Sequence, residues 1–246
     1  MNQIDLSVVK ALTHSAIATK QRLRIKWIVA SELCGSESTN PTISENAWAA
    51  LNSCDGIVVP GGFGSRGIEG KIAAIKYARE SKVPFLGICL GMQASVMEYC
   101  RNVLNRPNAH SCEFKEDLEE DEQVVIFMPE GDRERMGGTM RLGIRESILE
   151  KDSLAYSMYK EEKIMERHRH RYEINPNLVP ELEEAGLKFV GRNTDLSGER
   201  MEIIELDAEE HPYFVASQFH PEFTSRPEKP SPLFLGLLQH SKNRQV

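Results

Sequence analysis

The stretch "PFLGICLGMQASVMEYC", residues 84–100, decides how the rest of the chain is read. It begins as a short apolar run, typical of a buried strand, and after Cys89 its apolar residues follow helical spacing. Cys89 stands at this junction, between Gly87 and Gly91. Glycines on both sides of a residue at a strand-to-helix turn are typical of a nucleophile elbow, which raises a reactive side chain above the edge of a sheet. We therefore predict that Cys89 is a nucleophile and not a small core residue.

The helix expected to begin at Leu90 points its N–H groups and its positive end at the sulfur, which favours the reactive thiolate. The Leu90 N–H is then a natural donor to an oxyanion. A nucleophilic thiol also needs a base and a group that orients the base. The stretch "ASQFHPEF", residues 216–223, supplies both, since His220 ends an extended run and Glu222 follows two residues later. Residues i and i+2 of an extended chain point to the same side, so Glu222 is predicted to orient the His220 imidazole.

Helical and extended patterns alternate through the first part of the chain. Strands joined by helices in this way predict an α/β fold with a mainly parallel central sheet flanked by helices. The second half is richer in strand-like runs, which we expect to add antiparallel strands. The expected strands are 22–29, 55–60, 83–89, 123–128, 139–147, 187–191, 200–206 and 213–219; the expected helices are 5–18, 44–54 with Ser44 as N-cap, 68–81, 90–100, 177–186 and 231–240.

Composition limits the classes of function. With 246 residues, of which 40% are hydrophobic, the chain is long enough for one domain, residues 1–246, with a full core. A net charge of -7 argues against a nucleic-acid or anionic membrane partner. The sequence has no apolar stretch of membrane-spanning length and no signal-peptide pattern, so a cytoplasmic location is expected. Its 5 cysteines form no C-x-x-C pair, which predicts reduced thiols and no metal site.

Three stretches together, "PGGFGSRG" (60–67), "GICLGMQ" (87–93) and "FHPEF" (219–223), resemble the class I glutamine amidotransferase domain. That family has a flavodoxin-like sheet and hydrolyses glutamine to glutamate and ammonia with a Cys-His-Glu triad. The stretches "GGTMRLG" (137–143) and "ERHRHRYEINPNL" (166–178), with "SRPEKPSPLFLGLL" (225–238), resemble more closely the C-terminal glutaminase domain of CTP synthase. The resemblance extends from Ser7 to Leu238.

The resemblance implies roles for ten residues. Its triad falls on Cys89, His220 and Glu222, and its glutamine contacts fall on Gly62, Leu90, Gly91, Met92, Gln93, Glu113 and Arg171. Glu113 is expected to bind the α-ammonium group of glutamine, and the Arg171 region its α-carboxylate. Gly62, with no side chain, lets the backbone share the oxyanion role with Leu90. His168 and His170 are interpreted as structural residues or as support for the site.

The resemblance also implies what lies outside this chain. CTP synthases have an N-terminal synthetase domain that binds ATP, Mg and UTP, and this sequence contains no P-loop of the form G-x-x-x-x-G-K-[ST]. We therefore expect the synthetase domain to be absent, no cofactor in this domain, GTP as an activator, and a homo-oligomer, a tetramer, at full length. The first strand of the family's glutaminase domain is expected to be missing before the helix at residues 6–19. Cys112 stands where Thr is expected before Glu113.

Two other functions stay open at this point. The first is that of a γ-glutamyl hydrolase or another amidotransferase on the same fold; the stretches "GGTMRLG" and "RHRHRYE" favour CTP synthase over it. The second is that of a truncated module that acts in assembly without catalysis, since CTP synthases associate into tetramers and filaments. Intact triad residues count against that interpretation.

Overall fold

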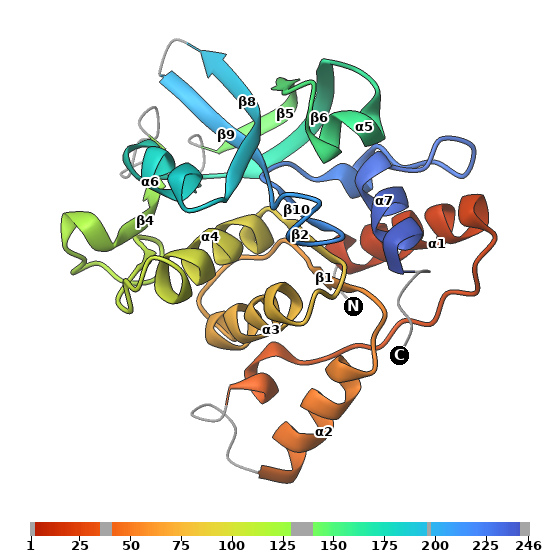
Figure 1. Ribbon diagram of the computed structural model, residues 1–246, viewed down its shortest axis with the longest axis horizontal. Coiled ribbons are helices and arrows are strands. Elements are labelled where there is room, and N and C mark those ends of the chain that lie inside the picture. Colours follow the sequence, from red (N-terminus) through yellow and green to blue (C-terminus); the bar gives the residue numbers. More distant parts are fainter. Residues whose placement is uncertain (1–2, 35–40, 129–139, 196–197, 242–246) are drawn as a thin grey trace.

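The computed structural model describes residues 3–34, 41–128, 140–195 and 198–241. Within these ranges the strands form a seven-stranded sheet, in the order β1-β2-β10-β9-β8-β5-β6, and a three-stranded sheet, in the order β3-β4-β7 (Figure 1). The strands are β1 (Ile57–Val59), β2 (Phe85–Ile88), β3 (His110–Ser111), β4 (Gln123–Phe127), β5 (Arg141–Leu149), β6 (Lys163–His170), β7 (Tyr172–Ile174), β8 (Lys188–Asp195), β9 (Gly198–Glu205) and β10 (Phe214–Ser217). The α-helices are α1 (Gln3–Thr19), α2 (Pro41–Asn52), α3 (Ile68–Glu80), α4 (Leu90–Asn102), α5 (Leu154–Tyr159), α6 (Val179–Glu184) and α7 (Pro232–Ser241). Short 3-10 helices are η1 (Ala30–Leu33), η2 (Glu120–Glu122), η3 (Pro176–Leu178) and η4 (Pro221–Phe223).

The large sheet is mixed. The strands β1, β2 and β10 pair in parallel, and β10, β9, β8, β5 and β6 pair with their neighbours in antiparallel fashion. The α/β class and the antiparallel strands of the second half are confirmed, whereas the parallel part is smaller than expected. Parallel neighbours need a long crossover, which α3 supplies between β1 and β2, while shorter connections in the second half favour antiparallel pairing.

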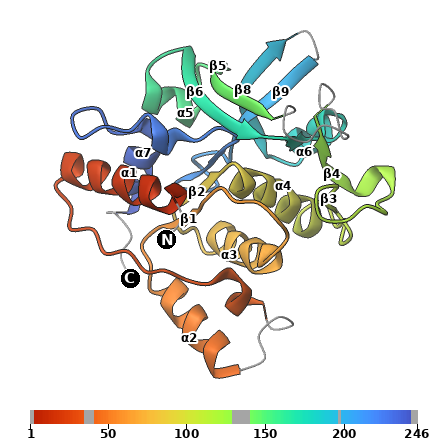
Figure 2. The ribbon, with the colours of Figure 1, turned by 180° about the vertical axis from the view of Figure 1, so that it is seen from behind.

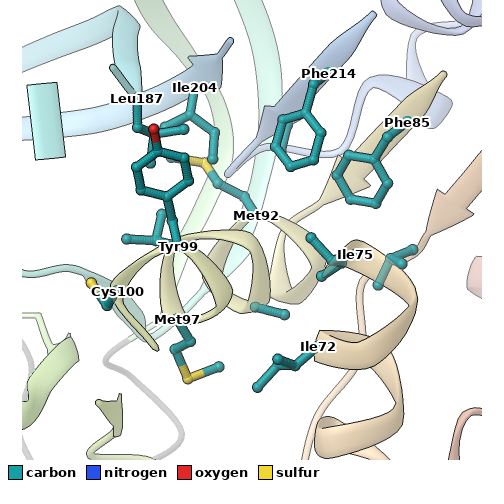
Figure 3. Close-up of a cluster of buried hydrophobic side chains, with 14 of the residues drawn as sticks. Ile72, Ile75, Phe85, Met92, Met97, Tyr99, Cys100, Leu187, Ile204 and Phe214 are labelled. Atoms are coloured by element: carbon teal, nitrogen blue, oxygen red, sulfur yellow. The ribbon is translucent and has the colours of Figure 1, made fainter. Parts of the chain in front are cut away.

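Helices cover both faces of the parallel strands, with α3 and α4 on one face and α1 and α7 on the other (Figures 1 and 2). Side chains along the strands therefore alternate between two apolar clusters. Phe85 and Phe214 belong to the cluster beneath α3 and α4 and stack with ring centroids 4.7 Å apart (Figure 3). Leu86 and Val215, the next residues along each strand, belong to the cluster beneath α1 and α7. Burial on both faces explains why these strands are apolar runs without polar alternation.

A close contact fixes the start of α4 against β1. A Cβ atom added at Gly91 would lie 2.1 Å from the Val59 carbonyl oxygen, so only glycine permits this approach. The first turn of α4 is thereby held beside the carboxyl ends of β1 and β2. In open α/β sheets this is the edge where ligands bind.

Two local predictions are wrong. Residues 22–29 belong to no described strand: Leu23 and Ile25 are half-buried against the α1 and α7 cluster, while Trp27 is 60% exposed. Of the alternating residues only Leu23 and Ile25 pack on that cluster, and the segment has no partner strand among the described residues. Helix α2 begins at Pro41, a residue favoured in the first turn of a helix, so Ser44 lies inside the helix and is not its N-cap.

Two further observations complete the fold. Residues 137–139 of the stretch "GGTMRLG" lie outside the described residues, and β5 begins at Arg141. None of the described helices combines the length and the apolar character needed to cross a membrane.

Candidate active site

Cys89 connects β2 to α4 in a backbone conformation that is rare for a residue with a side chain, with φ of 54° and ψ of -104°. Its N–H donates to the Ser217 carbonyl oxygen at 2.7 Å, and its own carbonyl oxygen accepts from the Met92 N–H at 3.0 Å. These bonds hold the strained turn between two parallel strands and the first turn of the helix. A strained strand-to-helix turn is what a nucleophile elbow requires. The Cys89 side chain is thereby fixed, and largely buried, at the carboxyl ends of β2 and β10.

His220 and Glu222 lie next to each other at the start of η4. Nδ1 of His220 and Oε1 of Glu222 are 2.8 Å apart, and both side chains are buried. The His220 N–H donates to the Arg167 carbonyl oxygen of β6 at 2.8 Å, and its ring stacks on Phe223 with centroids 5.2 Å apart. Because the carboxylate accepts from Nδ1, Nε2 is the nitrogen left for Cys89.

The electrostatics of the site favour a charged His220. Burial alone would lower the pKa of His220, but its interactions with the Cys89 thiol and the Glu222 carboxylate outweigh burial and raise it to about 10. Nε2 of His220 is buried and makes no hydrogen bond of normal geometry to the described residues, so its contact with the thiol is long or poorly aligned. Long contacts of this kind are common in catalytic sites without substrate. His220 is therefore held as an imidazolium beside the sulfur at neutral pH.

The glycine loop after β1 lies directly against Cys89 and His220. A Cβ atom added at Gly61 would lie 2.8 Å from Cε1 of His220 and 3.3 Å from Cβ of Cys89. At Gly62 the nearest atom, Cδ2 of Leu90, would be at an ordinary 3.6 Å. Gly61 thus makes the closest approach, whereas the family resemblance implies a role only for Gly62. The doublet in "PGGFG" carries no signal that separates the two glycines.

Glu113 and Arg171 lie near each other, beside Gly64 of the glycine loop. Burial raises the pKa of Glu113, and a hydrogen bond from the Gly64 backbone and the nearby Arg171 guanidinium oppose that rise. Nε of Arg171 is buried and has no hydrogen-bond partner among the described residues. Arg169, two residues before Arg171, contacts the nucleophile, since its carbonyl oxygen is 4.0 Å from Sγ of Cys89. An acid and a guanidinium beside one loop are the groups that recognise an amino acid's two charges.

The four residues after Cys89 differ in what they expose. The side chains of Leu90 and Met92 are fully buried in the core (Figure 3 shows Met92), so only their backbone atoms are available to a ligand. Gly91 packs on β1, as described above. The Gln93 amide is already engaged: its Nε2 donates to the Tyr172 carbonyl oxygen at 2.9 Å and to Oε1 of Gln218 at 3.1 Å.

One buried group has the residue types of a metal site. Ligand atoms of His168, His170 and Glu202 lie within 4.8 Å of one another. Burial lowers the pKa of His168 to about 2 and that of His170 to about 3, so both rings are neutral. The Arg141 guanidinium lies 3.5 Å from Oε1 of Glu202, and its charge opposes a bound cation. Since Nδ1 of His168 lies 3.2 Å from Nε2 of His170, and Nδ1 of His170 lies 3.1 Å from the Tyr172 carbonyl oxygen, we interpret the group as hydrogen-bonded support.

Comparison with known proteins gives a consistent result. Residues 4–240 match the family described as "Glutamine amidotransferase class-I". The chain is 51% identical over 243 residues to CTP synthase of Eremothecium gossypii, and 54% identical over 243 residues to CTP synthase 1-B of Xenopus laevis. Each match covers 97% of this chain, and 42% and 40% of the respective relative. The chain thus spans about two fifths of the length of these curated relatives.

A solved structure matches over nearly its whole length. The structure described as the glutaminase domain of Trypanosoma brucei CTPS with bound acivicin superimposes with a TM-score of 0.86 at 38% sequence identity. The match covers 98% of this chain and 89% of that one. With the sequence matches, it shows that this chain belongs to the class-I glutamine amidotransferase family and, within it, to the glutaminase domains of CTP synthases.

Proposed function

We propose that this chain hydrolyses L-glutamine to glutamate and ammonia, with Cys89 as nucleophile, His220 as general base and acid, and Glu222 as the residue that orients His220. The observation that carries the proposal is the strained Cys89 elbow beside a His220–Glu222 pair whose nitrogen and oxygen are 2.8 Å apart. The Trypanosoma brucei relative, a glutaminase domain with bound acivicin, supports it.

The reaction proceeds in two covalent steps. Sγ of Cys89 attacks the side-chain amide carbon of glutamine, and His220 gives a proton to the leaving nitrogen, so that ammonia departs and a γ-glutamyl thioester remains. Water then attacks the thioester carbon while His220 takes its proton, which releases glutamate and restores the thiolate. The backbone N–H groups of Leu90 and Gly62 stabilise the oxyanion formed in each step.

Recognition of glutamine uses its two charged groups. Glu113 binds the α-ammonium group, and Arg171 binds the α-carboxylate. Their proximity to each other and, for Glu113, the hydrogen bond from the Gly64 backbone support this assignment. Gly91, Met92 and Gln93 contribute to the same site, the first two through backbone atoms.

The test combines labelling with kinetics. An electrophilic analogue of glutamine is expected to label the peptide containing Cys89, and to leave the peptides of the other four cysteines unmodified. Cys89→Ala and His220→Ala should each lower glutamate release on the order of 10³-fold. Glu222→Gln should cost less, because the ring keeps its place, and Arg171→Ala should mainly raise KM. Modification of another cysteine with Cys89 untouched, or near-normal turnover by His220→Ala, would contradict the triad.

We propose that the ammonia released by this chain is used by a second domain of a longer protein. We place the ammonia in the ATP-dependent amination of UTP to CTP, on a synthetase domain that binds ATP, Mg and UTP and is regulated by GTP. Support comes from the CTP synthase relatives, of which this chain covers about two fifths. In this proposal residues 1–246 are a single glutaminase domain without a cofactor of its own, acting in the cytoplasm as part of a tetramer.

A further inference from the structure

The Cys89 sulfur has a neighbour to which the proposed mechanism gives no role. Nε2 of Gln218 lies 3.7 Å from Sγ of Cys89, within hydrogen-bond distance for sulfur. Gln218 follows β10 directly, is 1% exposed, and precedes His220 by two residues. Its backbone N–H donates to the Glu202 carbonyl oxygen at 2.9 Å, which fixes the residue to β9. A buried amide held this firmly against a reacting atom is positioned to affect its charge.

The hydrogen bonds determine which end of the Gln218 amide faces the sulfur. The Tyr172 carbonyl oxygen can only accept, so the Gln93 atom 2.9 Å away must be its Nε2. That same Nε2 lies 3.1 Å from Gln218, and a donor there requires the Oε1 of Gln218. The remaining end of the amide, Nε2, therefore points to Cys89. The chain from Tyr172 to Gln93 to Gln218 presents an N–H group to the sulfur.

We propose that Gln218 is a further catalytic residue, whose side-chain amide stabilises the Cys89 thiolate during glutamine hydrolysis. The proposal rests on the function proposed above. An N–H donor binds an anionic acceptor more strongly than a neutral one, so the contact favours thiolate over thiol. The sulfur needs such a donor, because the Arg169 carbonyl oxygen, 4.0 Å from it, favours the protonated thiol. Burial strengthens both effects through the low local dielectric.

The same contact acts at two points of the reaction. Before the attack it keeps the sulfur in its nucleophilic form beside the imidazolium of His220. In the second step, when water opens the thioester, the departing sulfur regains its negative charge and again accepts from Gln218. No proton is transferred to or from the amide, so the reaction remains balanced as written.

Two variants of Gln218 separate the donor from the shape of the side chain. Gln218→Glu is isosteric and keeps an oxygen for Gln93, but places a carboxylate where the N–H was. Gln218→Met keeps similar volume without a donor. The matched control is Gln123→Met, because the Gln123 amide also donates one hydrogen bond, to the Leu118 carbonyl oxygen at 3.0 Å, away from the sulfur.

The measurement is the rate at which iodoacetamide alkylates Cys89 as a function of pH, followed by the mass of its peptide. We expect the midpoint of this pH profile to rise by about one unit in Gln218→Met, and further in Gln218→Glu because like charges repel. At pH 7 kcat for glutamine should fall about tenfold, with KM little changed. Gln123→Met should match the parent protein in both assays, and thermal melting identifies any variant that fails to fold.

Each outcome decides the question. An unchanged alkylation midpoint in a folded Gln218→Glu protein overturns the role of Gln218, even if the parent protein hydrolyses glutamine. If the midpoint rises in the Gln218 variants but the parent protein does not hydrolyse glutamine, the contact with the thiolate is supported and the proposed function is overturned instead. An equal shift in Gln123→Met also overturns the inference, because the effect would then follow from the loss of any hydrogen-bonded amide.

Discussion

Gly61 and Gly62 are neighbours in the glycine loop, yet a methyl group meets different surroundings at each. At Gly61 it would lie 2.8 Å from the His220 ring, which Glu222 and Phe223 hold in place. We expect Gly61→Ala to displace the imidazole and lower glutamate release on the order of 10²-fold, because small misplacements of catalytic groups are costly. A Cβ atom at position 62 would make only ordinary contacts, so Gly62→Ala should reduce turnover only a few-fold. Steady-state assays of both variants make the comparison, and equal losses would contradict it.

At the level of single residues, roles that depend on a local sequence pattern could be predicted, whereas roles that depend on contacts between distant segments could not. Cys89 and the His220–Glu222 pair could be identified because an elbow and an i, i+2 spacing are visible in a few residues. The structure places them together, and their catalytic roles stay predictions. Gly61 and Gln218 could not be identified, since their importance arises only when the loop after β1 and the end of β10 meet Cys89 in space.

Between elements, a buried carboxyl group ties η4 to its surroundings. The Tyr159 hydroxyl at the end of α5 donates to Oε1 of Glu166 at 2.8 Å, and the Thr224 hydroxyl donates to Oε2 at 2.9 Å. Glu166 lies on β6, and Thr224 directly follows η4, which contains Glu222. The Glu166 carboxyl group thus joins α5, β6 and the turn that carries part of the proposed triad.

The buried Glu166 carboxyl group should make the free energy of unfolding depend on pH. Burial raises the pKa of Glu166 to about 7, so the folded chain binds more protons than the unfolded chain between pH 4.5 and 7. The contribution of Glu166 to the free energy of unfolding therefore falls as pH rises through that window. Relative to the parent protein, Glu166→Gln should gain stability between pH 5 and 8, on the order of 2 kcal/mol.

Urea unfolding at several pH values measures this difference. Glu184→Gln, a change on the exposed side of α6, removes one surface carboxyl group and controls for net charge. A pH-independent difference between Glu166→Gln and the parent protein would refute the expected ionisation of Glu166.

Most elements could be predicted from periodicity, and the exceptions have a physical cause. The buried strands β2 and β10 and the helices α3 and α4 were predicted because their apolar pattern reports burial directly. Residues 22–29 show apolar alternation but form no described strand, because Trp27 and Val29 are exposed and no described strand pairs with the segment. The start of α2 depended on Pro41, whose preference for the first turn outweighed the capping signal of Ser44.

For the whole molecule, the proposed link to CTP formation makes a separate prediction. Alone, the chain should release glutamate without ATP or UTP and form no CTP, because the proposal assigns UTP amination to a synthetase domain outside residues 1–246. Joined to the synthetase part of a CTP synthase, it should support glutamine-dependent CTP formation, and its Cys89→Ala variant should form CTP only when ammonia is added. Chromatographic detection of CTP tests both statements. CTP made by the chain alone would contradict the assignment, and a Cys89→Ala enzyme inactive with ammonia would show damage to the fold.

The architecture as a whole was only partly predictable. Alternating strands and helices gave the α/β class, but the balance between parallel and antiparallel pairing depends on how each connection crosses the sheet. The strand order β1-β2-β10 brings segments more than 100 residues apart into register, and that juxtaposition assembles the site.

The segment between β6 and β7 passes from the seven-stranded sheet to the three-stranded one, and Arg171 is the residue at that crossing. The next residue, Tyr172, offers a single carbonyl oxygen to two partners, Gln93 and His170. That oxygen determines the orientation of the Gln93 amide and of the His170 ring. The residue proposed to bind the substrate carboxylate is therefore the chain neighbour of the residue whose carbonyl oxygen anchors both the Gln93–Gln218 chain and the His168–His170 pair.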